Sequence, residues 1–426
     1  MTRPLVVLFA AALSVCPAEL EKDPAVRVAL EDLQEAMAAR GAGASRLTLM
    51  QVPDLGEQEY EWRNEPALEL RAATPLGAAF GITRLAWLAR TGQPFPSPAR
   101  REAPALPHRF VLTDLGLADT VEGPPGDPAD VARVTERFRS KLREALRFSQ
   151  NYVMVSGMEN YIPWEEPVYG PRAERYRRYL AAAVSAAHQL HLKLLLYGDE
   201  AIFLPSWLER FQARPSVKDP RFWSALQEKY RRLFRAVPEL DGISTRIGEM
   251  LPKYDFQALD LVHTPEQEPS PRIEERYRTY IRHIQDVVSG EFGKLFVHRT
   301  WVTNDWEQHS VPDVYRDTFT PQVPVRGLLL AIKLTKQDQW YYGSAFNPTF
   351  GQTPHATAAQ GELYSGYHGF GTIVDFPARW FGAAMQHARI HGTQGTYTTF
   401  PNRTLLAPGM FYVWSRLAWN PDSDVE

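Results

Sequence analysis

The fold is decided by three runs of residues: Leu192-Lys-Leu-Leu-Leu-Tyr197, Asp219-Pro-Arg-Phe-Trp223 and Gly242-Ile-Ser-Thr-Arg-Ile247. The first and third runs are short and rich in apolar or β-branched residues, which predicts buried strands. The Asp-Pro pair predicts a capped helix start, because aspartate accepts hydrogen bonds from the first helical N–H groups and proline fits the first turn. A strand, a helix and a strand in this order are typical of a parallel sheet covered by helices.

This strand–helix pattern repeats along most of the chain. Helices are predicted from Asp127, over 173–191, from Asp219 and over 272–288. About eight such units favour closure into an α/β fold of the (β/α)8 TIM barrel type over an open doubly wound sheet. No Gly-rich dinucleotide fingerprint or P-loop follows the first predicted strand, which further disfavours a Rossmann fold. The predicted strands are 108–115, 152–156, 192–197, 242–247, 295–302, 326–334, 362–368 and 395–399.

The residues before the barrel predict a smaller α/β domain. Two amphipathic helices flank two strand-like runs between Asp23 and Arg90. Residues 93–107 contain five prolines without any periodicity, which is typical of a linker. We therefore expect three segments in the mature chain: a small α/β domain over 19–91, a Pro-rich linker over 92–107 and a catalytic barrel over 108–426.

The first residues predict export. The only cysteine, Cys16, excludes an intramolecular disulfide and lies in a predicted signal peptide over 1–18, where Arg3 precedes an apolar run. We expect a secreted or periplasmic protein. The alternatives are a lipoprotein anchor at Cys16, which Val15 fits poorly, and a buried N-terminal strand. A formal net charge of −3 without a polybasic run makes nucleic acid and anionic membranes unexpected partners.

Acidic residues gather at the predicted carboxyl ends of the strands, where a barrel has its active site. Glycoside hydrolysis needs two carboxyl groups, an acid for the leaving oxygen and a base or nucleophile on the other side of the sugar. Metal sites also gather carboxylates, and some acids at this rim cap the following helix, so these interpretations stay open. The acidic residues are Asp114, Glu159, Asp199, Glu200, Glu249, Asp305 and Asp338.

Basic residues lie within or near the ends of three consecutive predicted strands: Arg246, Arg299 and Lys333. Cations in this position favour an anionic ligand, because Arg and Lys bind carboxylates through charge-assisted hydrogen bonds. The alternative is that they form internal salt bridges with Glu249 and Asp338. From the residues alone, an anionic ligand and internal salt bridges are equally well supported as interpretations.

From Asp219 to its end the chain resembles the α-glucuronidases of glycoside hydrolase family 67. In the N-terminal part, Gly77-Ala-Ala-Phe-Gly81 is similar to the last helix of the small hexosaminidase-like domain that precedes these barrels. The stretches that carry the main resemblance are Ile243 to Glu249, Arg299-Thr-Trp-Val302, Ile332-Lys333 with Asp338 five residues later, Pro348-Thr-Phe-Gly351 and Arg416-Leu-Ala-Trp-Asn-Pro-Asp422.

The resemblance implies an inverting, exo-acting enzyme that releases a uronic acid from an acidic oligosaccharide or polysaccharide. Glu249 would be the general acid, and Asp338 would be a base that activates water. Arg299 and Lys333 would bind the uronate carboxylate, with Arg246 as a third cation where the family has a lysine nearby. The further residues expected to contact the sugar are Trp301, Asp305 and Asn160.

The strand-seven segment departs from the family, which has two glutamates there. Glu362 matches the first glutamate, and the position of the second, catalytic one falls at or near His368. The chain ends at Glu426, before the helical domain that usually follows in the family, so the oligomeric state stays open. No cofactor is implied, and no metal site is expected because the histidines lack compact ligand spacing. Two alternatives remain: a glycosidase acting on another acidic sugar, and a catalytically silent barrel that binds acidic glycans.

Overall fold

The computed structural model describes residues 20–41, 47–64, 67–96, 99–115, 128–156, 170–247, 257–261, 272–301, 307–337, 345–363, 377–400 and 407–423. The predicted signal peptide lies outside these ranges. Within them, no helix combines the length and the apolar composition needed to cross a membrane.

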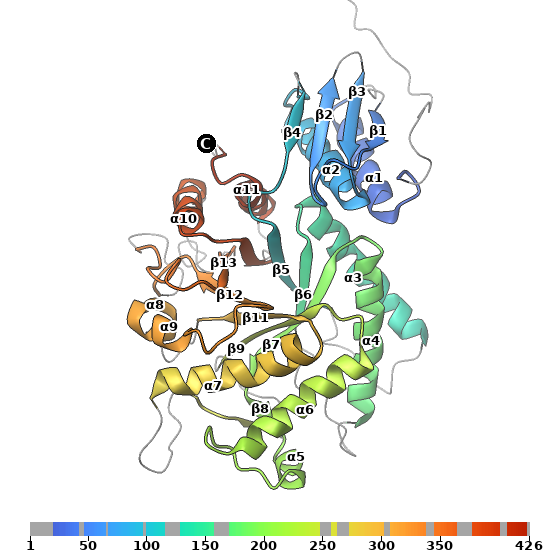
Figure 1. Cartoon of the computed structure of the whole chain (residues 1–426). Helices are drawn as coiled ribbons and strands as arrows, with labels where there is room; N and C mark the ends of the chain where they lie inside the picture. The colour runs from blue at the N-terminus through green and yellow to red at the C-terminus, as the bar shows by residue number, and fades with distance from the viewer. Residues whose placement is uncertain are drawn as a thin grey trace, which may run out of the picture.

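The N-terminal part of the chain forms a small domain with a four-stranded sheet and two helices (Figure 1). Its elements are α1 (Pro24–Ala39), β1 (Leu47–Gln51), β2 (Tyr60–Asn64), β3 (Leu68–Ala72), α2 (Pro75–Arg90) and β4 (Arg100–Glu102). The strand order is β1-β3-β2-β4, in which only β1 and β3 are parallel. Strand β4 lies within the segment predicted as a linker. The sequence did not predict this edge strand because its three charged residues have no apolar pattern.

Eight parallel strands close into a barrel, which confirms the predicted (β/α)8 TIM barrel. Neighbours around the barrel follow the order β11-β12-β13-β14-β5-β6-β7-β9. A separate antiparallel pair is formed by β8 (Ile202–Phe203) and β10 (Gln257–Ala258). The barrel strands are β5 (His108–Asp114), β6 (Tyr152–Ser156), β7 (Lys193–Glu200), β9 (Gly242–Ile247), β11 (Leu295–Arg299), β12 (Leu328–Lys333), β13 (Ala356–Gln360) and β14 (Gly395–Thr399).

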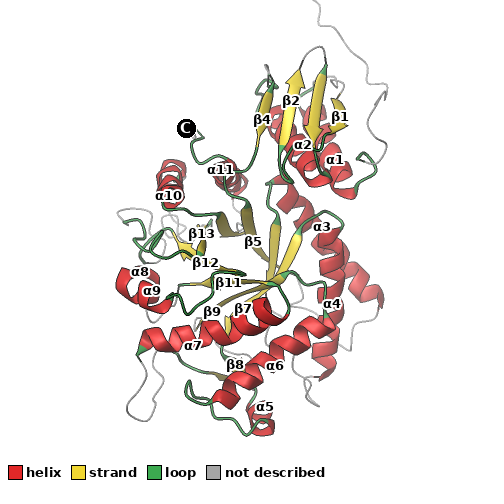
Figure 2. Ribbon diagram, in the orientation of Figure 1, coloured by secondary structure: helices red, strands yellow, loops and turns green. Residues whose placement is uncertain are grey.

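Helices surround the barrel strands (Figure 2). The buried apolar side chains between the strands and the longer helices form one continuous core. A second, smaller core fills the barrel interior. The helices are α3 (Pro128–Arg147), α4 (Gly170–His188), α5 (Pro205–Arg210), α6 (Pro220–Ala236), α7 (Ile273–Gln285) with the π-helical turn η1 (Asp286–Glu291), α8 (Glu307–Ser310), α9 (Pro312–Thr318), α10 (Ala378–Ile390) and α11 (Ala407–Trp419).

The seventh barrel strand lies earlier in the chain than predicted. Strand β13 occupies Ala356–Gln360, and Glu362 and Leu363 follow it outside any strand, so the prediction of a strand beginning at Glu362 was wrong. The segment Ala-Thr-Ala-Ala-Gln lacks the large β-branched and aromatic residues that signal a strand. Gly361, which follows the strand, packs tightly against the Trp414 ring of α11, since an added Cβ there would lie 2.3 Å from the ring.

The small domain packs against the amino ends of the barrel strands. Arg109, at the start of β5, is fully buried and donates hydrogen bonds to Gln58 Oε1 of the small domain at 2.6 Å and to the Ser149 carbonyl at 2.6 Å. Its guanidinium also lies 5.2 Å from the Phe80 ring centroid and 5.1 Å from that of Trp419. The carboxyl ends of the strands, where barrel active sites lie, are therefore at the opposite end.

Candidate active site

We call the open end of the barrel, at the carboxyl ends of its strands, the mouth. The alternation of side chains along each strand determines which polar residues point into it. The interior core contains Leu195 and Tyr197 of β7, Val297 of β11, Leu329 and Ala331 of β12. Because side chains two residues apart share one face of a strand, the next inward positions toward the carboxyl ends are polar. These inward polar residues are Asp199, Arg246, Arg299, Lys333 and Gln360.

Arg299 lies at the centre of a buried network in the mouth. Its side chain is only 5% exposed. It donates hydrogen bonds to the Tyr197 hydroxyl at 2.5 Å and to Gln360 Oε1 at 3.1 Å, and one Nη lies 3.6 Å from Glu362 Oε1. The ring centroids of Tyr197 and Tyr397 lie 5.5 and 5.3 Å from the guanidinium carbon. This guanidinium is held in one place by groups from three strands, β7, β13 and β14, and by Glu362, which follows β13.

The electrostatic surroundings keep Arg299 charged. Burial by itself lowers the pKa of Arg299, but Tyr197, Tyr397 and Glu362 outweigh that effect and place the pKa above its ordinary value. The mouth of the barrel therefore contains a permanent positive charge from which water is largely excluded, and such a charge interacts strongly with an anion.

Lys333 supplies a second buried cation on the neighbouring strand. It is 3% exposed, and its ammonium lies 4.0 Å from the ring centroid of Trp301, a short cation–π distance. Strands β11 and β12 pair directly in the barrel, with Arg299 opposite Ala331. The two cations thus project into the mouth from adjacent strands, as the sequence predicts.

Arg246 forms a close ion pair, but with a partner that the sequence does not single out. Its Nε donates to Asp199 Oδ1 at 2.6 Å, across the directly paired positions of β9 and β7. Both side chains are buried or nearly so. Since the salt bridges considered from the sequence alone involved Glu249 and Asp338, the pairings with Asp199 and Glu362 are new.

Glu362 is connected to the same network as Arg299. Its Oε1 accepts a hydrogen bond from Gln360 Nε2 at 2.5 Å, in addition to the ion pair with Arg299. Gln360 therefore links the arginine and the glutamate, donating to one and accepting from the other. The carboxylate of Glu362 is 12% exposed, so it remains accessible from the mouth.

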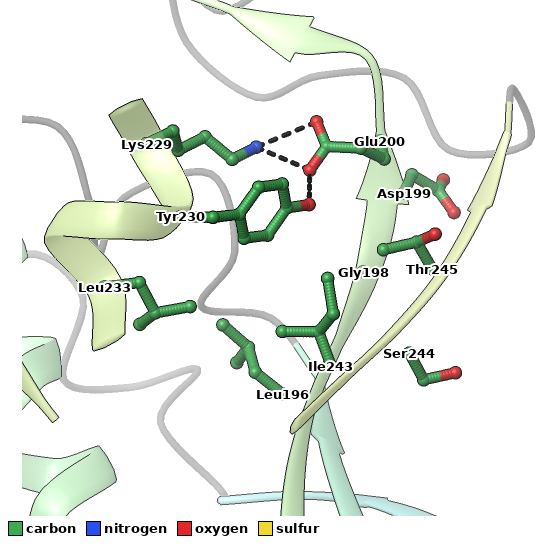
Figure 3. Close-up of a pocket in the computed structure, with 10 residues that line it drawn as sticks. All are labelled: Leu196, Gly198, Asp199, Glu200, Lys229, Tyr230, Leu233, Ile243, Ser244 and Thr245. Carbon is green, nitrogen blue, oxygen red and sulfur yellow. Dashed lines mark hydrogen bonds and ion pairs between the residues drawn. The ribbon is translucent and has the colours of Figure 1, made fainter. Parts of the chain in front are cut away.

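Glu200 points away from the mouth, although it follows Asp199 directly (Figure 3). Its carboxylate accepts hydrogen bonds from Lys229 Nζ at 2.8 Å and from the Tyr230 hydroxyl, both from α6. Asp199 lies on the other face of β7, as alternation requires. Glu200 thus ties the end of β7 to its covering helix, and this acidic residue belongs to the barrel wall rather than to the site.

Several predicted site residues lie outside the described ranges. Strand β9 ends two residues before Glu249, and the description of the β12 end stops one residue before Asp338. Their separation, and hence the pair of carboxyl groups required for hydrolysis, is therefore not described. The other predicted residues outside these ranges are His368, Asp305 and Asn160.

Two fully buried histidines, His298 and His309, hydrogen-bond to neighbouring groups of the protein. His309 Nε2 lies 2.9 Å from the Thr335 carbonyl, and His298 Nε2 lies 3.1 Å from Gln308 Oε1. Burial lowers the pKa of His298 to about 4. Among the described residues, no three His, Cys, Asp or Glu side chains gather closely enough to hold a metal ion.

Three residues of the network were missed by the sequence prediction: Tyr197, Gln360 and Tyr397. Alternation identifies Tyr197, which lies two positions before Asp199 and so on the same face of β7. Tyr397 lies opposite Gln360 in the paired strands β14 and β13. Gln360 was hidden by the misplaced seventh strand.

Solved structures of glycoside hydrolases have a similar fold, whereas no family model and no curated protein sequence matches this chain. A family GH138 enzyme that targets the pectin rhamnogalacturonan II has a TM-score of 0.60 at 12% identity, over 94% of this chain and 50% of that one. A family GH115 4-O-methyl-α-glucuronidase with specificity for decorated arabinogalactans has a TM-score of 0.55 at 14% identity, over 96% and 56%.

A family GH20 exo-β-N-acetylglucosaminidase from Vibrio harveyi has a TM-score of 0.52 at 10% identity, over 94% of this chain and 70% of that one. At these identities the likeness shows a shared fold alone. The chain spans about half the length of the GH138 and GH115 enzymes. Family 67, which the sequence resembles, is not among these three.

Proposed function

We propose that this protein is a glycoside hydrolase that removes a uronic acid from an acidic oligosaccharide or polysaccharide. The observation that carries the proposal is the pair of buried cations, Arg299 and Lys333, on adjacent strands in the barrel mouth. Removing a charge from water is costly unless a partner compensates for it. Two buried cations side by side attract an anion, and a sugar carboxylate entering the mouth would bind both through charge-assisted hydrogen bonds.

The sugar ring has suitable contacts beside these cations. Trp301 presents its ring to Lys333, and the Glu362 carboxylate accepts hydrogen bonds at the same level. We propose that Glu362 hydrogen-bonds a sugar hydroxyl, because a carboxylate held by Gln360 and Arg299 has a fixed direction. This arrangement selects one orientation of a terminal acidic sugar, which supports exo action.

The chemistry is assigned to Glu249 and Asp338. We propose that Glu249, following β9, protonates the leaving oxygen, while Asp338, following β12, activates water on the opposite side of the ring. In an inverting enzyme the two carboxyl groups lie roughly 6.5–9.5 Å apart, which leaves room for that water. A general acid must be protonated near the working pH, and neighbouring carboxylates favour its protonated form.

Three further assignments belong to this proposal. The resemblance places the family's second catalytic glutamate at or near His368, so we propose that Asp338 acts without a carboxylate helper. The small N-terminal domain is of the hexosaminidase-like type and supports the barrel. The protein acts outside the cytoplasm, after removal of residues 1–18.

The proposal is tested by a panel of substrates incubated with the purified protein. The panel contains glucuronoxylan-type oligosaccharides, aryl α-glucuronides and matched neutral glycosides, and mass spectrometry identifies the released sugars. Release of a uronic acid from the nonreducing end is expected, and its first-formed anomer, seen by NMR, should have the inverted configuration. Binding of acidic glycans without any turnover would instead favour a catalytically silent barrel.

A further inference from the structure

A second recess lies at the amino end of the barrel, away from the proposed active site. It is formed where α2 of the small domain meets α11 and the chain just before β6. About 290 Å³ of this recess is free of protein atoms, and part of that space is open to solvent. Three arginines line it, together with the hydroxyl-bearing side chain of Tyr412. Arg147 of α3 pairs with Asp32, which leaves Arg84 from α2 and Arg416 from α11.

Among the described residues, the guanidinium groups of Arg84 and Arg416 have few hydrogen-bond acceptors. Arg84 Nη1 donates to the Tyr412 hydroxyl at 2.8 Å, while its buried Nε has no acceptor. Arg416 donates no hydrogen bond to a described side chain or carbonyl, and no described carboxylate lies within ion-pair distance of either arginine. Buried or half-buried donors without acceptors are costly, so such a pair is typical of a binding site.

The positive charge of Arg84 and Arg416 also favours an anionic ligand. The pKa of Arg416 is lowered, first by burial and then by the positive charge of Arg84, which shows that the two cations repel one another. The nearest compensating carboxylate, Glu102, accepts a hydrogen bond from the Tyr60 hydroxyl at 2.7 Å and pairs with Arg100 Nε at 3.0 Å. A net positive charge therefore remains in the recess.

We propose that this recess binds a small oxyanion of the phosphate, sulfate or carboxylate class, which bridges Arg84 and Arg416. Each guanidinium presents a planar fork of donors that matches an oxyanion, and charge-assisted hydrogen bonds of this kind are the strong ones. Only about 20 Å³ of the recess accommodates the centres of water-sized groups, so it excludes a sugar chain and would bind a small anion at its open side. Since the two arginines come from different domains, the bound anion would join the small domain to the barrel.

Titration with inorganic phosphate tests this proposal directly. At constant ionic strength, calorimetry on the wild-type protein should show saturable binding of one phosphate, and phosphate should raise the unfolding temperature more than chloride does. Arg84→Gln and Arg416→Gln should each weaken phosphate binding by about tenfold, the loss expected from one charge-assisted hydrogen bond. Arg235→Gln, which removes the same charge from a 65% exposed side chain, should bind as the wild type does.

A second probe separates the possible sources of the anion. Acetate is titrated in the Lys333→Met background, which weakens carboxylate binding in the active site. Acetate binding that is lost in Arg416→Gln would show that carboxylates also occupy the recess, and phosphate binding alone would restrict the site to tetrahedral anions. If Arg416→Gln fails to fold, Arg416→Lys keeps the charge without the fork and should still weaken phosphate binding. Absence of saturable binding by the wild type, or equal binding by all variants, overturns the proposal whatever the outcome for the active site.

Discussion

Replacing Lys333 by methionine removes one charge from the proposed carboxylate site with little change in shape. Methionine has a similar length, and its thioether keeps a favourable contact with the Trp301 ring. Because Lys333 is 3% exposed, little water could replace its ammonium beside a bound carboxylate. Leaving a desolvated charge short of one partner costs about 2–4 kcal/mol. This corresponds to a loss of roughly 30-fold to roughly 1000-fold in kcat/KM on a uronide.

The assay compares kcat/KM on an aryl glucuronide with kcat/KM on the matched aryl glucoside, which lacks the carboxylate. The large loss should appear on the glucuronide alone. Lys294→Met is the matched control, since Lys294 lies at the amino end of β11 and donates to the Pro238 carbonyl at 2.6 Å. This control should leave both activities unchanged. Equal losses on the charged and the neutral substrate in Lys333→Met would mean that Lys333 supports the barrel rather than the ligand, and the reasoning would be refuted.

Three other perturbations have defined outcomes. Glu249→Gln and Asp338→Asn should each abolish turnover of the best uronide, while His368→Ala should retain a reduced rate. If Asp338→Asn is active and His368→Ala is inactive, the catalytic base lies in the seventh-strand segment and is not Asp338. The lowered pKa of His298, about 4, means that the unfolded chain binds a proton below about pH 6.5 that the folded protein excludes. The free energy of unfolding in urea should therefore fall by up to about 3 kcal/mol as the pH drops from 6.5 to 4, and His298→Gln should flatten that slope. Gly242→Ala places a Cβ 2.1 Å from a backbone oxygen of β11, so its thermal unfolding should show a destabilisation of at least about 1–3 kcal/mol; an unchanged unfolding temperature would contradict the tight β9–β11 packing.

The barrel was predictable because its strands and helices have distinct apolar periods. Strands β6, β9 and β14 begin and end at the predicted residues, since each is a short run bounded by polar or turn-forming residues. Strand β13 was misplaced because its alanines give no strand signal, and the close packing of Trp414 from α11 against the following Gly361 is not visible in the sequence. Contacts between segments more than 50 residues apart leave no local trace in the sequence.

The sequence was enough to select the cations of the candidate site, but not to predict which carboxylates they pair with. Arg299 and Lys333 were identified because they end consecutive strands, and alternation places both in the mouth. The ion pair between Arg246 and Asp199 depends on the register of β9 against β7, which the sequence alone does not determine. Alternation could have separated Asp199 from Glu200, since adjacent residues of a strand face opposite sides.

Recognition of a sugar carboxylate by the buried cations of the barrel mouth is tested by comparing two substrates of the wild-type protein. Initial rates are measured on one aryl α-glucuronide and on its methyl ester, which has no charge and one additional methyl group. We expect release of the uronic acid with a kcat/KM at least about 30-fold higher for the free acid, the lower bound set by about 2 kcal/mol. Equal rates on acid and ester, or hydrolysis of neutral glycosides alone, would contradict it.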